Sequence, residues 1–207
     1  MSINVRKATS ADASFLAQMI LKSTRAAKKI GLFDFIFNAS SDEEVLTLLQ
    51  KLTNTNAKSS AHYSNFLIAE IDGKCVGTLC SYEPRIATKD VFLKALLEIG
   101  IDASENECLG VLNVCGFEPN NKILVFDYMQ EVDGFMDVGV LKALMQKSLL
   151  NARLKGYRLA QTVVEMGSLE TLMYYKKLGF REVEQKECEA YKELFGRAGL
   201  TLLSIEF

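Results

Sequence analysis

The sequence has one histidine, His62, and five cysteines, none of which forms a C-x-x-C pair. A zinc site of the usual spacing therefore has too few ligands, and we expect no metal. A Ser-His-Asp or Cys-His enzyme would depend on His62, which lies in the polar stretch "AKSSAHYSN" and makes that class unfavourable. We predict reduced structural thiols in a cytoplasmic protein. The cysteines are Cys75, Cys80, Cys108, Cys115 and Cys188.

Long apolar runs and a strong net charge are also missing. No run approaches the ~18 residues of a membrane span, and the opening "MSINVRKATSAD" lacks the apolar stretch of a signal peptide. The net charge is −2, so neither nucleic acid nor a membrane is expected as a partner. With 207 residues, 49% of them apolar, the chain fits a single soluble domain (residues 1–207) with a partly helical insertion at about 84–121.

The first half of the chain predicts antiparallel strands and capped helices. Residues 3–8 have a strand pattern, and a helix with an apolar stripe begins near Thr9 or Ser10. Residues 41–52 predict a second helix with acids in its first turn. The clearest pattern is a hairpin over residues 65–82, whose strands flank Asp72-Gly73, a pair that type I′ turns prefer.

The second half predicts a strand, a helix and a parallel strand. Residues 123–132 form a nearly continuous apolar run, as in a strand buried on both faces. An amphipathic helix follows and ends at Lys155-Gly156, and a further strand covers 158–166. A right-handed crossover between these strands, added to the hairpin, predicts a mixed α/β sheet. Further strands are expected at 180–187 and 200–207.

The helix in "SLETLMYYKKLGF" carries two adjacent tyrosines, Tyr174 and Tyr175, on the same face as Leu178. Gly179 suits the left-handed position past a helix end, and Phe180 supplies the apolar contact that accompanies such caps. Packing therefore explains Leu-Gly-Phe. It does not explain the tyrosines, because each buried hydroxyl needs a partner, so they are either core residues or participants in chemistry.

The order of these elements, together with the motif S-x-x-T-x-x-Y-Y-x-x-L-G-F, resembles the GNAT-type N-acetyltransferase superfamily. Ser168, Thr171 and Tyr175 take the positions of Asn, Ala and Tyr in the family's N-x-x-A-x-x-L-Y-x-x-L-G-F. The resemblance covers most of the chain and is thin over residues 25–60 and 84–121. It implies the acyl-CoA N-acyltransferase fold, a mixed and mostly antiparallel central sheet flanked by helices, with parallel strands 4 and 5 splayed apart.

The resemblance also implies acetyl-CoA as cosubstrate and a site that holds it. The family's pyrophosphate loop falls on residues 136–141, where helix N-terminal amides would face an anion. Met136 and Leu141 depart from the family pattern, and Asp137 could cap the helix in place of a phosphate. The implied cosubstrate-binding residues are Gln130, Glu131, Val132, Val138, Gly139, Val140, Leu141, Ser168 and Tyr175.

Acetyl transfer needs a neutral amine and a proton for the departing thiolate. The resemblance makes Tyr175 the general acid, with Tyr174 as its alternative, and a strand amide near Glu131 or Val132 would stabilise the thioester oxygen. Glu131 is the predicted base, with Asp127 and Glu165 as further candidates. Each of the three could instead be a solvated carboxylate that only attracts a cation.

The expected acceptor is a primary amine of a small molecule or a peptide. A homodimer that forms by pairing of an exposed C-terminal strand is also possible. One alternative is a non-catalytic member of the fold that acts as a CoA sensor or interaction module, because the pyrophosphate loop is degenerate. Another is an α/β enzyme that binds a nucleotide or S-adenosylmethionine, but "VRKATSAD" lacks the Gly-rich turn that such an enzyme places after its first strand.

Overall fold

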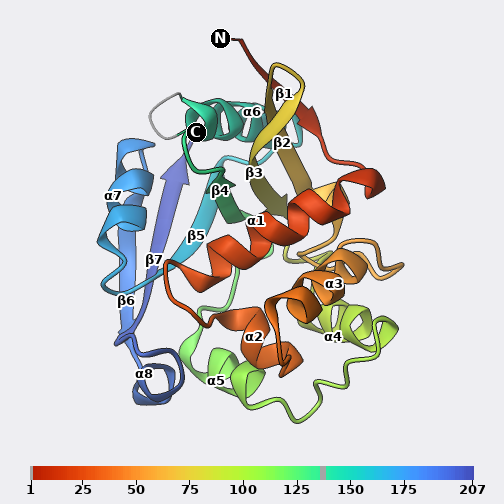
Figure 1. Cartoon of the computed structure of the whole chain (residues 1–207). Coiled ribbons are helices and arrows are strands. Elements are labelled where there is room, and N and C mark those ends of the chain that lie inside the picture. Colours follow the sequence, from red (N-terminus) through yellow and green to blue (C-terminus); the bar gives the residue numbers. More distant parts are fainter. Residues whose placement is uncertain (1, 136–138) are drawn as a thin grey trace.

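The computed structural model describes residues 2–135 and 139–207, which form one seven-stranded sheet with helices on both faces (Figure 1). The strand order is β1-β2-β3-β4-β5-β7-β6. The strands are β1 (Ile3–Lys7), β2 (Phe66–Ile71), β3 (Lys74–Tyr82), β4 (Leu124–Glu131), β5 (Leu159–Glu165), β6 (Arg181–Glu187) and β7 (Gly199–Glu206). The α-helices are α1 (Ala13–Arg25), α2 (Leu32–Phe37), α3 (Asp42–Leu52), α4 (Lys89–Glu98), α5 (Glu107–Cys115), α6 (Val140–Leu154), α7 (Leu169–Lys177) and α8 (Glu189–Phe195).

Local sequence explains the turns and helix ends of this fold. Asp72 and Gly73 have φ angles of +50° and +75°, so the β2–β3 hairpin has the predicted turn. The Ser41 side chain accepts a hydrogen bond from the Glu44 amide at 3.3 Å and caps α3. Gly156, with φ +88°, follows the end of α6 as expected. These predictions are confirmed.

The sheet is mixed, as predicted. Strands β1 to β4 pair antiparallel in chain order, and β7 pairs antiparallel with both β5 and β6. The one parallel pair is β4 with β5 among the described strands, and it is limited to Leu124 with Ala160 and Val125 with Gln161. Because β7 has a partner on each side, the C-terminal strand has no free edge, and the expectation of an exposed one is wrong.

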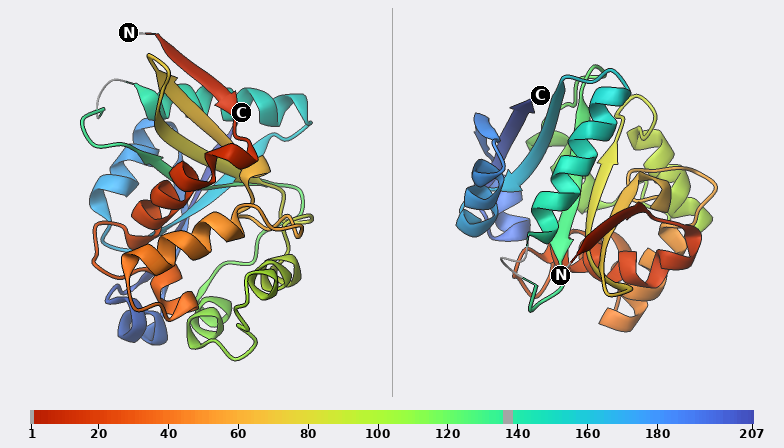
Figure 2. Two further views of the ribbon diagram at one scale, coloured as in Figure 1. Left: turned by 45° about the vertical axis from the view of Figure 1, so that its right-hand side comes forward. Right: turned by 90° about the horizontal axis from the view of Figure 1, so that it is seen from above.

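Two apolar cores cover the two faces of the sheet. On the first, which we call the α1 face, helices α1 to α5 and α8 bury residues such as Phe33, Cys80 and Tyr128. On the second, the α6 face, α6 and α7 bury residues such as Phe126 and Tyr175. Figure 1 shows α1 crossing its face of the sheet, and the right-hand view of Figure 2 shows α6 lying along the strands.

The end of α7 explains the Leu-Gly-Phe sequence. The Phe180 amide donates to the Tyr175 carbonyl at 3.1 Å, and the Gly179 amide donates to the Lys176 carbonyl at 3.0 Å. Gly179 has a φ of +100°, and the rings of Tyr175 and Phe180 pack edge to face at 5.1 Å. This pattern of two hydrogen bonds and one apolar contact is a Schellman cap, so the predicted packing is confirmed.

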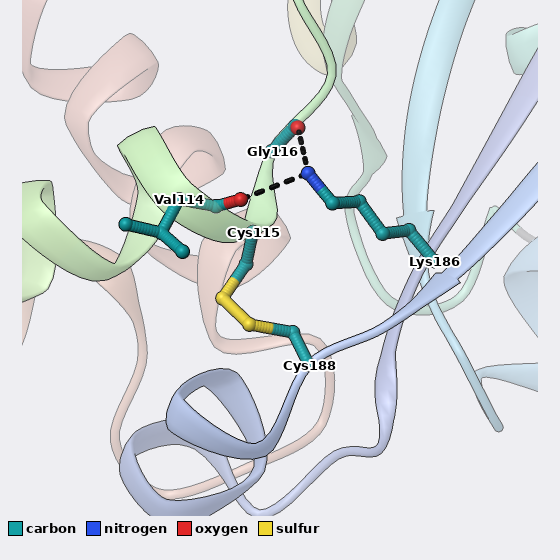
Figure 3. The surroundings of a disulfide bond; sticks show 5 residues. All are labelled: Val114, Cys115, Gly116, Lys186 and Cys188. Atoms are coloured by element: carbon teal, nitrogen blue, oxygen red, sulfur yellow. Dashed lines mark hydrogen bonds between the residues drawn. A yellow bond between two sulfur atoms is a disulfide. The ribbon is translucent and has the colours of Figure 1, made fainter.

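A disulfide joins the segment between β3 and β4 to the C-terminal part of the chain. Cys115 at the end of α5 bonds to Cys188 just before α8, with their Cα atoms 5.7 Å apart (Figure 3). Beside it, the Lys186 ammonium donates to the carbonyls of Val114 (2.8 Å) and Gly116 (3.1 Å). The prediction that all five thiols are reduced is therefore wrong: the fold brings together two cysteines that are 73 residues apart.

Two short helices were not predicted. The aromatic run at Leu32–Phe37 is α2, and residues between the last two strands form α8. Both contribute aromatic side chains to the α1 face, where Phe35 and Phe195 pack edge to face at 5.3 Å. Within the ranges given above, no helix has the length and apolar character needed to span a membrane.

Candidate active site

The opening between β4 and β5 is the central feature of the candidate site. The two strands are hydrogen-bonded partners only up to Val125 and Gln161, and Figure 1 shows them running apart beyond that point. Backbone groups of β4 that face β5 therefore have no strand partner there within the described chain. Strand groups without a strand partner are suited to bind an extended ligand.

A β-bulge in β4 lies just beyond the last parallel pair. Cys80 of β3 pairs with Asp127, whereas Thr78, two residues away, pairs with Gln130, so β4 has one extra residue here. Tyr128 lies at the bulge and has a φ of +46°, which is uncommon for a residue other than glycine. The Thr78 hydroxyl donates to the Tyr128 carbonyl at 3.2 Å and holds the bulge. Bulges often occur beside active sites, where they redirect side chains.

Asp127 is a half-buried carboxylate with no counter-charge among the described residues. Its Oδ1 accepts a hydrogen bond from the Tyr128 amide at 2.7 Å, and among the described residues no cation forms an ion pair with it. Burial raises the pKa of this carboxyl to about 6, against the stabilising effect of that amide. A pKa shifted this far from its ordinary value is frequent among functional residues.

Three tyrosines and a thiol surround this carboxylate. Burial raises the pKa values of Tyr82, Tyr128 and Tyr175 above the usual tyrosine range, and the negative charge of Asp127 raises them further. The same two causes raise the pKa of the Cys80 thiol. All four groups therefore stay protonated near neutral pH, so Asp127 is the group in this cluster that can accept a proton.

Tyr175 reaches the opening from α7. Its side chain is buried, and its hydroxyl has one partner in the described structure, the Thr162 hydroxyl of β5 at 3.5 Å. That distance is long for a hydrogen bond, and a phenol both donates and accepts, so Tyr175 retains hydrogen-bonding capacity. The edge-to-face contact with Phe180 fixes the ring.

The N-terminus of α6 lies beside the end of β4. A Cβ atom at Gly77 of β3 would lie 2.7 Å from Val140 Cγ1 and 3.1 Å from the Gln130 carbonyl, so glycine allows this close approach. Gly139, with φ +90°, precedes the first turn, which contains no acidic residue. Amides at such an end favour an anion. The predicted loop residues Met136, Asp137 and Val138 lie outside the described residues.

The other predicted cosubstrate-binding residues line the two strand ends. Val140 and Leu141 are buried at the start of α6, and Gln130, Glu131 and Val132 lie at the end of β4. The Val132 amide donates to the Val76 carbonyl at 2.9 Å, so this N–H is used within the sheet. The Glu131 carbonyl accepts from the Lys22 ammonium at 3.0 Å.

Ser168 lies just after β5 and precedes α7. Its Oγ is buried and has no hydrogen-bond partner among the described residues, and it makes no side-chain cap to α7. An unpaired buried hydroxyl is costly, because it has lost its water without gaining a partner. It lies three residues beyond the end of β5, a strand that flanks the opening, and this position agrees with its predicted contact to a ligand.

Glu165, also at the end of β5, has the opposite environment to Asp127. Its Oε1 accepts from the Lys28 ammonium at 2.5 Å and from the Tyr191 hydroxyl at 3.0 Å, and Arg197 lies 3.7 Å from Oε2. Lys28 comes from the loop after α1, and the other two groups come from α8 and the loop after it. Glu165 thus joins three distant segments, which sequence spacing did not reveal.

His62 does not form part of this site. The His62 imidazole is buried, its Nδ1 lies 2.8 Å from the Ser64 hydroxyl, and burial lowers its pKa. No group of three or more His, Cys, Asp or Glu side chains in the described segments is arranged to hold a metal ion.

In three dimensions the chain is similar to solved N-acetyltransferases. An acetyltransferase crystal structure superposes with a TM-score of 0.69 at 17% identity, covering 98% of each chain. An N-acetyltransferase from Staphylococcus aureus Mu50 gives 0.68 at 15% identity, covering 98% of this chain and 100% of the other. This chain has the GNAT N-acetyltransferase fold.

A solved structure that contains coenzyme A has the same fold. The aminoglycoside acetyltransferase AAC(6')-Ib in complex with coenzyme A has a TM-score of 0.57 at 15% identity, covering 99% of this chain and 95% of the other. By sequence, no protein-family model and no curated protein matches the chain. The predicted fold class is therefore confirmed by shape, at identities that are informative about the fold alone.

Proposed function

We propose that this protein transfers an acetyl group from acetyl-CoA to a primary amine. The observation that carries the proposal is the opening between β4 and β5, with an unpaired carboxylate, Asp127, and a buried phenol, Tyr175, on its sides. The GNAT fold supports the same chemistry, since coenzyme A accompanies one of the solved structures that share it.

The residues of the opening fit acetyl-CoA. The unpaired Ser168 hydroxyl and the unpaired backbone of β4 supply hydrogen-bonding groups for an amide-containing arm, and the start of α6 at Gly139 supplies amides for a pyrophosphate. When bound, acetyl-CoA would supply the activated acetyl group as a thioester. We place Gln130, Glu131, Val140 and Leu141 along its path, with Val132 as a flanking position.

We assign the role of general base to Asp127 rather than Glu131. Asp127 takes a proton from the acceptor ammonium and leaves a neutral amine to attack the thioester carbon. A C–N bond forms as the C–S bond breaks, and the nitrogen then releases its second proton to solvent. Its raised pKa brings it closer to that of an amine and makes it a better acceptor than an ordinary carboxylate. Glu131 lies at the end of β4, four residues beyond Asp127, and is the alternative base.

Tyr175 is the proposed general acid. The departing sulfur takes the phenolic proton of Tyr175, and the phenol recovers a proton from solvent or from Asp127. The charge of Asp127 already acts on Tyr175, so the acid and the base lie in one electrostatic cluster. Each group lies on its own face of the sheet: Tyr175 on the α6 face and Asp127 on the α1 face, beside Cys80. The acceptor would accordingly enter from the α1 face.

A non-catalytic member of the fold is the second candidate function. Met136 and Leu141 in place of the family's residues favour it, whereas Asp127 and Tyr175 do not, because an interaction module has no use for a half-buried unpaired carboxylate. Calorimetric titration with acetyl-CoA, with desulfo-CoA and ATP as controls, tests whether the site is intact.

We expect the two CoA ligands to bind with micromolar affinity and ATP not to bind. A coupled assay of thiol release with a panel of amines then measures transfer. Binding without transfer to any amine would establish the non-catalytic alternative. No binding of either CoA ligand at millimolar concentration would contradict both candidate functions that involve CoA.

A further inference from the structure

The charges around the opening restrict the kind of amine that fits. Asp127 is the carboxylate there without a cation in the described part of the chain. Four other acids, on the segments around α1 and at the end of β5, form ion pairs with side chains of this chain. These pairs are Lys28–Glu165 (2.5 Å), Arg25–Asp34 (2.7 Å), Arg25–Asp42 (2.6 Å) and Lys22–Asp133 (2.6 Å).

The cluster at the end of β5 also has an excess of positive charge. Lys28 and Arg197 share one carboxylate, Glu165, which leaves one positive charge uncompensated. Their side chains are 20% and 33% exposed, so this charge is partly accessible to a ligand. A second ammonium group on an acceptor bound at Asp127 would meet repulsion here and no free carboxylate.

The surface between these charges is apolar. Val163 of β5 lies two residues beyond Gln161, as Asp127 lies two residues beyond Val125, so the two lie on the same face of the sheet, on opposite sides of the opening. Val163 is 43% exposed, although it lies on an interior strand of the sheet. Tyr82 of β3 is half-buried on the same side as Asp127. An apolar body attached to a single amine would cover these groups.

The segment between β3 and β4 closes this face. In α4, Phe92 packs against Phe33 of α2, with ring centroids 6.5 Å apart, and Phe33 packs against Tyr128 at 6.3 Å. The Asn106 side chain donates to the carbonyls of Phe35 and Ile36, and the disulfide holds α5 against α8. An extended peptide crossing the α1 face would have to displace these contacts.

From these observations we propose that the acceptor is a small monoamine with an apolar body, held by an ion pair to Asp127 and by contact with Val163 and Tyr82. Polyamines, aminoglycosides and lysine-containing peptides are excluded by the charges and by the covering helices. This inference rests on the proposed function and extends it to a substrate class.

The test compares five acceptors in the thiol-release assay: phenethylamine, hexylamine, spermidine, an aminoglycoside and a lysine-containing peptide. We expect kcat/KM for the two monoamines to exceed that of every polycation by about tenfold or more, because the second charge is unpaired. Equal or better use of a polycation, with acetyl-CoA binding intact, would overturn the substrate class and leave acetyl transfer standing. Failure of acetyl-CoA to bind would instead overturn the proposed function.

A substitution of the exposed Val163 that changes acceptor specificity provides a second test. Val163→Asp adds a carboxylate to the acceptor surface, and we expect the ratio of spermidine to hexylamine kcat/KM to rise by about tenfold. Val183→Asp on β6, where the valine is 57% exposed on an edge strand, is the matched control and should leave the ratio unchanged. An unchanged ratio in Val163→Asp would contradict the placement of the acceptor beside Val163.

Discussion

Asp127 and Glu165 are carboxylates on the two strands that flank the same opening, yet their environments are opposite. Glu165 contacts Lys28, Arg197 and the Tyr191 hydroxyl, which come from distant parts of the chain. Asp127 has the Tyr128 amide and no cation among the described residues. The ion pairs of Glu165 stabilise the fold. The unpaired Asp127 lowers the stability of the folded protein but supplies a proton acceptor whose pKa lies near neutral pH.

The comparison teaches that burial alone does not identify a functional acid. A paired carboxylate has its charge compensated and holds segments together, so its removal should affect the folded state. An unpaired carboxylate destabilises the folded state, because it loses water without gaining a cation. Its presence therefore indicates a role other than stabilising the fold. Each of the following predictions separates the two carboxylates by a different measurement.

The largest expected effect is on the rate. Asp127→Asn removes the proton acceptor while keeping the side-chain shape, and kcat should fall by about 10²- to 10⁴-fold, the usual contribution of a general base. Steady-state kinetics with the best amine measures kcat, and calorimetry should show an unchanged Kd for acetyl-CoA.

Glu165→Gln and Glu131→Gln are the matched controls for that experiment. Each should keep kcat within about threefold of the wild type, because neither carboxylate is the proposed base. A fall in kcat for Glu131→Gln as large as that for Asp127→Asn would show that Glu131 is the base. Asp127 would then have no established catalytic role to distinguish it from Glu165.

A smaller effect is expected from the acid. Tyr175→Phe keeps the ring that packs on Phe180 and removes the hydroxyl 3.5 Å from Thr162. We expect kcat to fall by about 10- to 100-fold, less than for the base, because a thiolate is a fair leaving group without a proton. Acetyl-CoA affinity should change by less than about twofold. Equal rates for the variant and the wild type would remove Tyr175 from the mechanism.

The pH dependence sharpens the comparison further. With a carboxyl pKa of about 6, Asp127 is protonated below that pH, and kcat/KM should fall about tenfold for each further pH unit of acidification. Glu165→Gln should show the same inflection as the wild type. An acid limb that lies near pH ~4, the range of an ordinary carboxyl, would show that a solvated group and not Asp127 controls the rate.

Much of the fold could be predicted because its signals are local. The Asp72-Gly73 turn, the Gly156 stop and the Leu-Gly-Phe cap each depend on residues within one turn of each other, and all three have the expected geometry. The apolar run "ILVFDYMQEV" contains two acids, and the first of them, Asp127, lies at the bulge beside Tyr128.

The features that were missed depend on contacts between distant residues. Lys28 and Glu165 are 137 positions apart, and Cys115 and Cys188 are 73 apart, so neither pair has a spacing signal. The seven residues of α8 are too few to show a helical period, and their apolar face is defined only when Tyr191 and Phe195 meet the α1 face. The unpaired state of Asp127 could likewise not be predicted, because it depends on which cations pack elsewhere.

The most direct test of the contrast is the free energy of unfolding of the wild type, Asp127→Asn and Glu165→Gln in urea. The folded-state pKa of Asp127, about 6, lies above that of the unfolded chain, so its contribution to stability is present below pH ~4 and is lost as the pH rises through about 6. At pH ~8 we therefore predict that Asp127→Asn is more stable than the wild type by about 1 to 3 kcal/mol, a gain that disappears near pH ~4.

Glu165→Gln should be less stable than the wild type by about 1 to 3 kcal/mol at pH ~8, because Lys28 and Arg197 lose their partner. We therefore predict that the change in the free energy of unfolding has opposite signs in the two variants. If both variants lose stability, Asp127 has a partner that stabilises it in the folded protein, and the distinction between a structural and a functional carboxylate is contradicted.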